Sequence, residues 1–349
     1  MTAREYSCFA YWQGRYGGLA PRMAFTATDP DGYARWRQAF GAKYEECLGE
    51  VPQGTEPLDV AVVEEVEQPE YIRRKVVYSA DRLSRIPAYL FLPRNAPRPA
   101  PAIICPHGHG RGKVDPAGVA ATESDAAHIR AYNYDYAEQF ARRGYVTLAP
   151  DARCFGERTD DPAEVYGHMQ IREGDHWCDV NFVLGMLIGV PLLGLHVFDI
   201  GRGIDLLQGL QEVDGRRIGA VGLSFGGALT LFSAAHDPRI KVAGVSGYFN
   251  SWRAYPMIDG ELCGSEVIPG LLRYGDHAEV AGLIAPRPLF VEFGTRDPLF
   301  PVQAGLAAFE TVRKIYALAG AADRLESEVF PGAHEFRGNR IFEFFARWL

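Results

Sequence analysis

The 349-residue sequence has no surplus of basic residues, no clustered cysteines and no long hydrophobic run. Its formal net charge is −8, with 36 Lys and Arg against 44 Asp and Glu, so we expect no nucleic-acid partner. The six cysteines form no C-x-x-C pair and no His/Cys cluster at zinc-ligand spacing, which gives no sign of a disulfide framework or a metal site. This cysteine usage fits a reducing, cytoplasmic setting.

The sequence also lacks the roughly 18 uninterrupted apolar residues that a membrane-spanning helix needs. Segment 182–198 comes nearest, but glycines, a proline and His196 interrupt it. We interpret this segment as a buried loop or a cap helix. The N-terminal residues lack the apolar core of a signal peptide, and we expect no membrane partner.

Residues 1–70 carry few strand signals and are expected to form a helical extension that packs on the main domain. A helix is predicted from Asp31 to Leu48, ending before Gly49, because apolar residues recur every fourth position there. This apolar stripe consists of Trp36, Phe40 and Tyr44. Packing explains the stripe most simply, and a role in gating substrate is the alternative. Segment 60–63 could be a strand or part of a linker.

Strand signals then alternate with helical segments from residue 71 to the C-terminus. The expected strands are short apolar runs at 74–79, 86–92, 102–105, 145–149, 217–222, 240–246, 288–293 and 325–330. The first two resemble an antiparallel pair, and the later ones are typical of strands buried on both faces. This alternation predicts a doubly wound, mostly parallel α/β sheet with helices on both faces. We therefore expect one α/β domain over residues 71–349.

The segment around Ser224 combines a buried strand, a tight glycine turn and a helix. Gly222 and Gly226 flank Leu223-Ser224-Phe225 in a Gly-x-Ser-x-Gly pattern, and an apolar helical run follows at once. Small residues on either side let the backbone turn sharply enough to expose the serine hydroxyl. The pattern predicts a nucleophile elbow with Ser224 as the nucleophile.

A serine nucleophile needs a histidine base and a carboxylate that orients it. Asp297 directly follows one expected strand, and His334 directly follows the last one. Glu292, which lies within a strand, and Asp323 are the competing carboxylates. The chain order Ser, Asp, His is that of the α/β-hydrolase triad. The competing histidines, none of which follows the last strand, are His107, His109, His176 and His196.

The loop 106–110 follows the third of these strands, where an oxyanion-hole donor is expected. Gly108 and Gly110 allow the backbone to approach the substrate oxygen. We predict that the N–H groups of Phe225 and His109 hold the oxyanion, and that His107 and His109 shape the loop.

Together these motifs resemble those of serine esterases of the α/β-hydrolase superfamily, close to the dienelactone-hydrolase-like and acetyl-xylan-esterase-like group. The likeness covers roughly residues 75–349. It implies an eight-stranded sheet, hydrolysis through an acyl-serine, and no cofactor or metal. Ser224 departs from the cysteine of dienelactone hydrolases proper, which favours an esterase. The loop 151–157 is similar to the family's Asp-x-Arg-Gly-x-Gly loop, with Cys154 in place of a glycine.

We expect a carboxylic ester hydrolase for short-acyl esters such as acetylated sugars or small xenobiotic esters. Segment 155–194 is long enough to be a lid-like insertion or a contact between subunits of a homo-oligomer. The alternatives are a C–C bond hydrolase, a peptidase-like hydrolase and a low-turnover binding protein. An ion pair between Asp151 and Arg153 competes with a substrate contact by Arg153. The expected substrate contacts are His107, Gly108, Arg153, Trp177, Tyr248 and Trp252.

Overall fold

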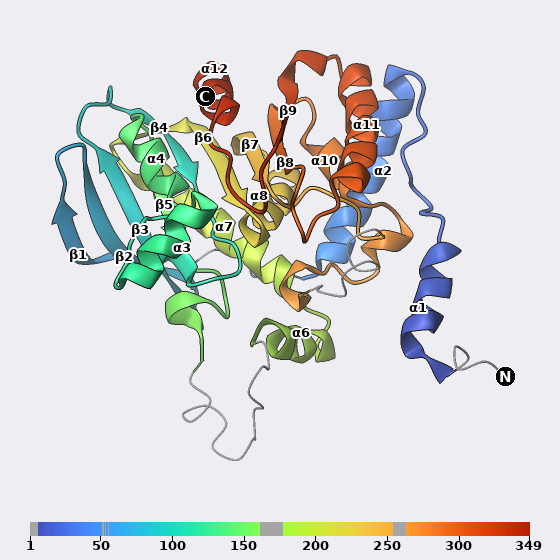
Figure 1. Cartoon of the computed structure of the whole chain (residues 1–349), viewed down its shortest axis with the longest axis horizontal. Helices are drawn as coiled ribbons and strands as arrows, with labels where there is room; N and C mark the ends of the chain where they lie inside the picture. The colour runs from blue at the N-terminus through green and yellow to red at the C-terminus, as the bar shows by residue number, and fades with distance from the viewer. Residues whose placement is uncertain (1–5, 51, 53, 55, 161–176, 254–262) are drawn as a thin grey trace.

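One nine-stranded sheet runs through the protein, with helices against both of its faces (Figure 1). The computed structural model describes residues 6–50, 52, 54, 56–160, 177–253 and 263–349. The strands are β1 Ala61–Glu67, β2 Tyr71–Asp81, β3 Ser84–Pro93, β4 Ala100–Ile104, β5 Val146–Pro150, β6 Val213–Leu223, β7 Ile240–Ser246, β8 Leu289–Gly294 and β9 Leu325–Phe330.

The helices alternate with the strands after β4. They are α1 Cys8–Gly17, α2 Pro30–Leu48, α3 Glu123–Tyr132, α4 Tyr136–Arg142, α6 Trp177–Leu187, α7 Leu192–Gly209, α8 Phe225–His236, α10 His277–Ile284, α11 Val302–Leu318 and α12 Arg340–Trp348. Short 3-10 turns are η2 Gly112–Val114, η3 Gly156–Arg158, η4 Gly264–Glu266, η5 Leu271–Arg273 and η6 Ala322–Arg324.

The strand order is β1-β2-β3-β5-β4-β6-β7-β8-β9. Strands β4 to β9 pair in parallel, whereas β1, β2 and β3 pair antiparallel and β3 also joins β5 antiparallel. The expected doubly wound, mostly parallel fold is confirmed. Because consecutive parallel strands end at the same edge, the loops that follow β4, β6, β8 and β9 are gathered there.

The expected number of eight strands was wrong, because β1 adds a ninth at one edge. Its side chains are mostly exposed, so it lacks the apolar alternation that marks a half-buried strand. Glu65 lies opposite Arg74 and forms an ion pair with it at 2.6 Å. Complementary charges on segments 61–67 and 71–81 are therefore the sequence feature that indicates the pairing of β1 with β2. Strand β1 also lies inside the segment 1–70, so a boundary at residue 70 separates two hydrogen-bonded strands.

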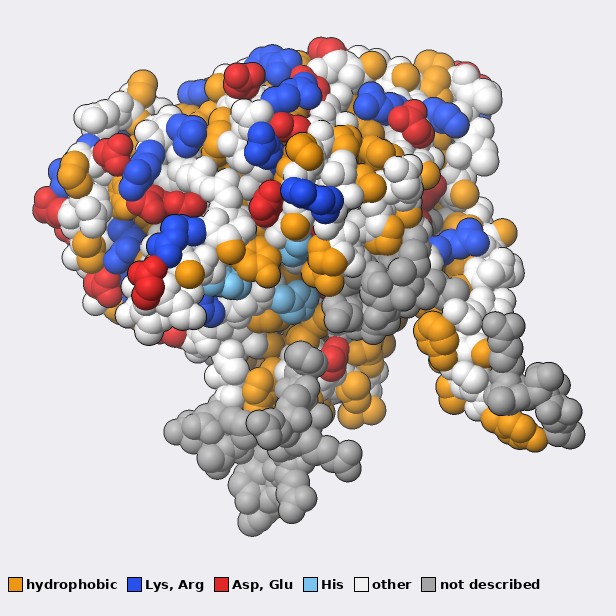
Figure 2. Space-filling view, in the orientation of Figure 1, with side chains coloured by type: hydrophobic (Ala, Val, Ile, Leu, Met, Phe, Trp, Pro, Cys, Tyr) orange, Lys and Arg blue, Asp and Glu red, His pale blue; other side chains and the backbone are white. Residues whose placement is uncertain are grey.

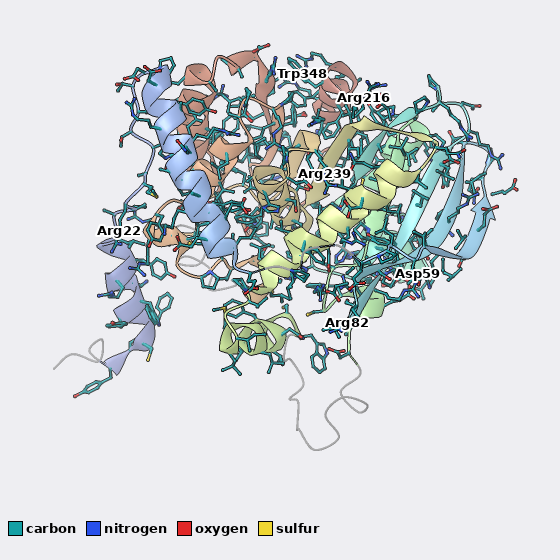
Figure 3. All side chains as sticks on the ribbon, turned by 180° about the vertical axis from the view of Figure 1, so that it is seen from behind. Arg22, Asp59, Arg82, Arg216, Arg239 and Trp348 are labelled. Carbon is teal, nitrogen blue, oxygen red and sulfur yellow. The ribbon has the colours of Figure 1, made fainter. Side chains whose placement is uncertain are left out.

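Two hydrophobic cores lie on opposite faces of the sheet. One packs α2, α7, α8, α10 and α11 on the sheet, and the other packs α3, α4 and α12. Seen from behind, α7 and α2 cross the first of these faces (Figure 3). Helices packed on both faces hold the ends of the central strands in place, and the candidate site is built on those strand ends.

Helix α2 matches the predicted helix closely. The side chain of Asp29 accepts a hydrogen bond from the N–H of Gly32 at 2.7 Å, and Gly49 after the helix has φ +87°. Phe40 and Tyr44 are fully buried, against a core shared with α10 and α11. By contrast, α1 buries none of its residues, and Figure 1 shows it standing away from the body.

The expected lid-like insertion 155–194 lies only partly within the described residues. His176 and the rest of 161–176 are outside them. After that gap come α6 and the start of α7, which is largely buried. Among the described residues, no single helix is long and apolar enough to cross a membrane; α6 and α7 meet the length and composition requirements only as a pair bent by 102°.

Candidate active site

Ser224 occupies a sharp turn between β6 and α8. Its backbone has φ +60° and ψ −127°, a conformation that residues other than glycine rarely adopt. A Cβ atom at Gly222 would lie 2.3 Å from the backbone of Gly226, and one at Gly226 would lie 2.2 Å from the Pro106 oxygen. Only glycine therefore permits this crossing. The strand, turn and helix lie where the sequence pattern predicts an elbow.

His334 and Asp297 form a hydrogen-bonded pair at the adjacent strand ends. Nδ1 of His334 lies 2.8 Å from Oδ2 of Asp297, and the side chains are 11% and 2% exposed. The other carboxylate oxygen accepts the N–H groups of Leu299 and Phe300 at 2.9 and 3.1 Å. This fixed carboxylate makes Nδ1 of His334 the proton donor, so Nε2 is the nitrogen available as a base.

The same strand ends bring His334 towards Ser224. The N–H of Ser224 donates to the Ser246 oxygen at 2.9 Å, and Gly247 follows directly. A Cβ at Gly247 would lie 3.3 Å from Cε1 of His334, so the imidazole edge lies against the loop that holds the elbow. The Phe300 ring stacks on His334 at 5.6 Å and keeps the imidazole in place. Histidine side chains gather on this face between hydrophobic ones (Figure 2).

The loop after β4 runs beside the elbow. A Cβ at Gly108 would lie 3.1 Å from Cβ of Ser224 and 2.3 Å from the Tyr134 hydroxyl oxygen. The loop therefore approaches the nucleophile as closely as a backbone can. Phe225 is the first residue of α8, so its N–H has no partner within the helix and lies at the positive end of the helix dipole.

His107 supports this loop from beneath. It is fully buried, Nε2 accepts the N–H of Ala152 at 3.0 Å, and Nδ1 donates to the Gly108 oxygen at 2.7 Å. Burial lowers its pKa, so the ring is neutral with the proton on Nδ1. Both nitrogens are thus occupied, which is a correction to the expected substrate contact by His107.

His109 lies at the mouth of the loop. Its ring centroid is 5.0 Å from that of Phe225 and 5.3 Å from that of Phe155. His109 is exposed. Partial loss of solvation lowers the pKa of its imidazole, but a hydrogen bond with Cys263 and the charge of Glu266 outweigh that effect and raise the pKa. The ring therefore borders the site, while its backbone belongs to the predicted oxyanion loop.

Arg153 braces the site from a distance. Its guanidinium binds both carboxylate oxygens of Asp199 in α7, at 2.9 and 2.8 Å. The expected ion pair between Asp151 and Arg153 is wrong, because Asp151 instead binds Nζ of the buried Lys113 at 2.7 Å. Cys154, the residue after Arg153, has φ +72°. The family's glycine conformation is kept here despite the cysteine, and Arg153 is committed to a carboxylate rather than to substrate.

Tyr248 and Trp252 are both buried, and Tyr248 packs against Phe300, the ring that stacks on His334. Tyr248 is 1% exposed and its ring lies 5.5 Å from Phe300, whereas Trp252 is 5% exposed and stacks on Phe232 at 5.8 Å. These contacts pack both rings against neighbouring aromatic side chains, and the expected substrate contacts of Tyr248 and Trp252 stay predictions. Trp177 begins α6 and is partly buried.

Two features near His109 were missed from the sequence. Glu266 in η4 is 2% exposed, and burial raises its pKa against the opposing effects of His109 and His334. Cys178 and Cys263 lie close to His109, and the three side chains could supply metal ligands. These three side chains lie 69 residues or more from one another along the chain, so no local motif could have revealed them.

Comparison with known proteins gives matches along most of the chain. The model of a family described as "Abhydrolase family" matches residues 5–184, slightly more than half of the chain, and that of "Acetyl xylan esterase (AXE1)" matches residues 130–277. A Bacillus subtilis protein with the name "Putative hydrolase YtaP" is 26% identical over 281 residues, covering 79% of this chain and 86% of its own.

Solved structures share the fold. A "putative acetyl xylan esterase" from Bacteroides fragilis superposes with a TM-score of 0.76 at 18% identity, covering 93% of this chain and 82% of that one. A glucuronoyl esterase from Solibacter usitatus gives 0.66 at 18% identity, covering 94% and 96%. Together with the family models, these likenesses confirm the α/β-hydrolase fold that the motifs indicated.

Proposed function

The chain belongs to the Abhydrolase family, and we propose that it hydrolyses carboxylic esters with Ser224 as its nucleophile. The observation that carries the proposal is the 2.8 Å contact between His334 and Asp297 at strand ends beside a serine held at φ +60°. A positioned base, an orienting carboxylate and an accessible serine are the groups that acyl transfer requires, and Ser224 is partly exposed.

In the first half of the reaction, Nε2 of His334 takes the hydroxyl proton as Ser224 Oγ attacks the ester carbonyl. The carbonyl oxygen becomes an oxyanion, which the N–H groups of Phe225 and His109 stabilise. Asp297 stabilises the imidazolium through Nδ1. His334 then gives its proton to the departing alcohol oxygen, and the acyl group remains on Ser224.

In the second half, His334 removes a proton from water, and the resulting hydroxide equivalent attacks the acyl-serine. The same N–H groups hold the second oxyanion. Collapse of this intermediate expels Ser224 Oγ, which recovers the proton from His334, and releases the carboxylic acid. No further cofactor enters this cycle.

The proposed substrates are short-acyl esters, with acetylated sugars or small xenobiotic esters as candidates. The acetyl xylan esterase model spans residues 130–277, a stretch that includes the elbow, and this overlap supports an acetyl group. The glucuronoyl esterase likeness supports the fold, and a methyl glucuronate ester is therefore the informative comparison substrate.

The test compares wild type with Ser224→Ala on p-nitrophenyl acetate. Loss of the nucleophile is expected to lower kcat by about 10³-fold or more. Ser233→Ala is the matched control, because Ser233 lies in α8, the helix that follows Ser224, and its Oγ has no hydrogen-bond partner among the described residues. Equal rates for wild type and Ser224→Ala would overturn the proposal.

A fluorophosphonate probe tests the same site independently of turnover. Mass spectrometry of the digested protein should place the phosphonyl group on Ser224 in wild type and in Ser233→Ala, and nowhere in Ser224→Ala. Acetylated xylo-oligosaccharides and a methyl glucuronate ester, assayed side by side, then separate acetyl esterase from glucuronoyl esterase activity.

A further inference from the structure

Two cysteines from distant parts of the chain meet beside the oxyanion loop. Cys178 is the second residue of α6, and Cys263 directly precedes η4, yet their sulfur atoms lie 2.7 Å apart across 85 residues of sequence. Both are free thiols in this structure. A ring nitrogen of His109 lies within 4.8 Å of both sulfur atoms. Thiol, thiol and imidazole together form a cluster that ester hydrolysis does not use.

We propose that Cys178 and Cys263 are a site of reversible oxidation, in which a low-molecular-weight disulfide such as oxidised glutathione converts the two thiols to a disulfide bond. The bond would tie α6 to η4 at the rim of the active site. The proposal concerns the thiols alone and does not rest on the proposed esterase activity.

The neighbouring backbone is already held in the arrangement that a bridge needs. The side chain of Asp179, next to Cys178, accepts the N–H of Gly264, next to Cys263, at 2.7 Å. A Cβ at Gly264 would lie 2.5 Å from Cβ of Phe182, so α6 and η4 are in direct contact. A disulfide has its sulfur atoms about 2.05 Å apart. The two sulfur atoms, 2.7 Å apart, therefore need to approach by about 0.65 Å to reach the bonded distance.

The exchange proceeds in two balanced steps. His109 accepts the thiol proton of Cys263, the more exposed cysteine of the pair, and the thiolate attacks the disulfide bond of oxidised glutathione. One glutathione leaves as its thiol once it takes up the proton. Cys178 then attacks the sulfur of Cys263 in the mixed disulfide, and the second glutathione leaves with the Cys178 proton. The protein loses two electrons and two protons, and oxidised glutathione becomes two glutathione thiols.

Proton loss controls the rate, because the thiolate is the attacking species. The hydrogen bond with Cys178 and then burial raise the pKa of Cys263, while His109 opposes both effects.

A metal ion is the competing occupant of this cluster. Two thiolates bound to one tetrahedral zinc, each at about 2.3 Å, lie about 3.8 Å apart. That separation is roughly 1 Å longer than the 2.7 Å between these sulfur atoms, so the cluster would have to open for zinc and to close slightly for a disulfide. The geometry favours the disulfide.

The test uses the full-length wild-type protein, reduced and then incubated at pH 8.5 to 9 with excess oxidised glutathione. Alkylation after denaturation should find the six thiols of the sequence reduced to four, with the intact mass lower by two hydrogen atoms. Proteolysis without reductant should yield one cross-linked peptide pair containing Cys178 and Cys263, and dithiothreitol should restore all six thiols.

Two variants control the assignment. Cys263→Ala should remove the cross-link, whereas Cys8→Ser, at an exposed cysteine, should retain it. Cys154 is a half-buried cysteine whose pKa is affected by Cys263. A cross-link to Cys154, or an unchanged thiol count, would overturn the proposal. Zinc bound in one equivalent by the reduced protein, protecting both thiols from alkylation, would overturn it in favour of a metal site.

Discussion

Nδ1 of His334 lies 2.8 Å from Oδ2 of Asp297, although 37 residues separate them in the chain. The N–H groups of Leu299 and Phe300 hold the other carboxylate oxygen, and the Phe300 ring stacks on the imidazole. One short loop after β8 therefore orients the histidine in two ways. The orientation of the base is built into the fold before any substrate arrives.

Replacing Asp297 by Asn should lower kcat by about 10³- to 10⁴-fold. The amide N–H₂ would donate to Nδ1 of His334, which places the imidazole proton on Nε2 and blocks proton transfer from Ser224. Steady-state kinetics on p-nitrophenyl acetate measure the effect. Asp323→Asn changes a competing carboxylate that is exposed in η6 and should leave kcat unchanged. A wild-type rate in Asp297→Asn would remove Asp297 from the triad.

Strain at the nucleophile gives a second prediction. Ser224 has φ +60° and ψ −127°, a region that costs a residue other than glycine about 1–3 kcal/mol. The free energy of unfolding of Ser224→Gly should exceed that of Ser224→Ala by up to about 2.5 kcal/mol, after about 0.5–1 kcal/mol is deducted for the flexibility of glycine. Urea titration of both inactive variants measures the difference. A Ser224→Gly variant less stable than Ser224→Ala would mean that the elbow carries less strain than the flexibility of glycine costs.

The elbow and the acid–base pair could be predicted because their signals are local. Gly222 and Gly226 mark the turn, and Asp297 and His334 each directly follow a strand. Parallel topology alone brings such loops together. The nine-residue span of Gly222 to Thr230 thus needed no tertiary information.

The supporting contacts could not be predicted, because they depend on how distant segments pack. Proximity in sequence suggests a pair between Arg153 and Asp151, whereas Arg153 binds Asp199 of the distant helix α7. His107 was expected near substrate because it belongs to the loop, and only the fold shows that both of its nitrogens are engaged. Burial of a polar side chain is a property of the assembled structure.

Glu292 gives a pH-dependent prediction. It is 1% exposed in β8 and accepts the N–H groups of Arg337 and Gly338 at 3.1 and 3.2 Å, and burial raises its pKa from 4.5 to about 7. Between these values the native carboxyl binds a proton that the unfolded one has lost. The free energy of unfolding therefore falls as pH rises through this window, by about 3 kcal/mol in total.

Glu292→Gln should remove this slope, since glutamine does not titrate. The stability of the variant relative to wild type should rise by about 3 kcal/mol between pH 4.5 and 8, as measured by urea unfolding. Glu310→Gln, at an exposed position in α11, should show no such trend. A difference between Glu292→Gln and wild type that stays constant with pH would contradict the raised pKa.

His196 should act in the opposite direction. It lies 5.3 Å from the Phe225 ring, is 1% exposed, and neither ring nitrogen has a hydrogen-bond partner among the described residues. Burial lowers its pKa from 6.5 to about 3. Between these values the unfolded imidazole binds a proton that the native one cannot, so stability falls as pH falls below 6.5. At pH 5 the loss is about 2 kcal/mol.

His196→Leu should therefore gain about 2 kcal/mol relative to wild type on going from pH 8 to pH 5, and it should fold well because it removes an unpaired buried polar ring. His236→Gln is the matched control of opposite sign. Glu45 holds the pKa of His236 above its usual value, so its stabilisation is present below pH 6.5 and is lost as pH rises through the native pKa. Urea unfolding at both pH values should show His236→Gln weakened more at pH 5. A gain at pH 5 in both variants would mean that the two imidazoles share one environment, which the structure contradicts.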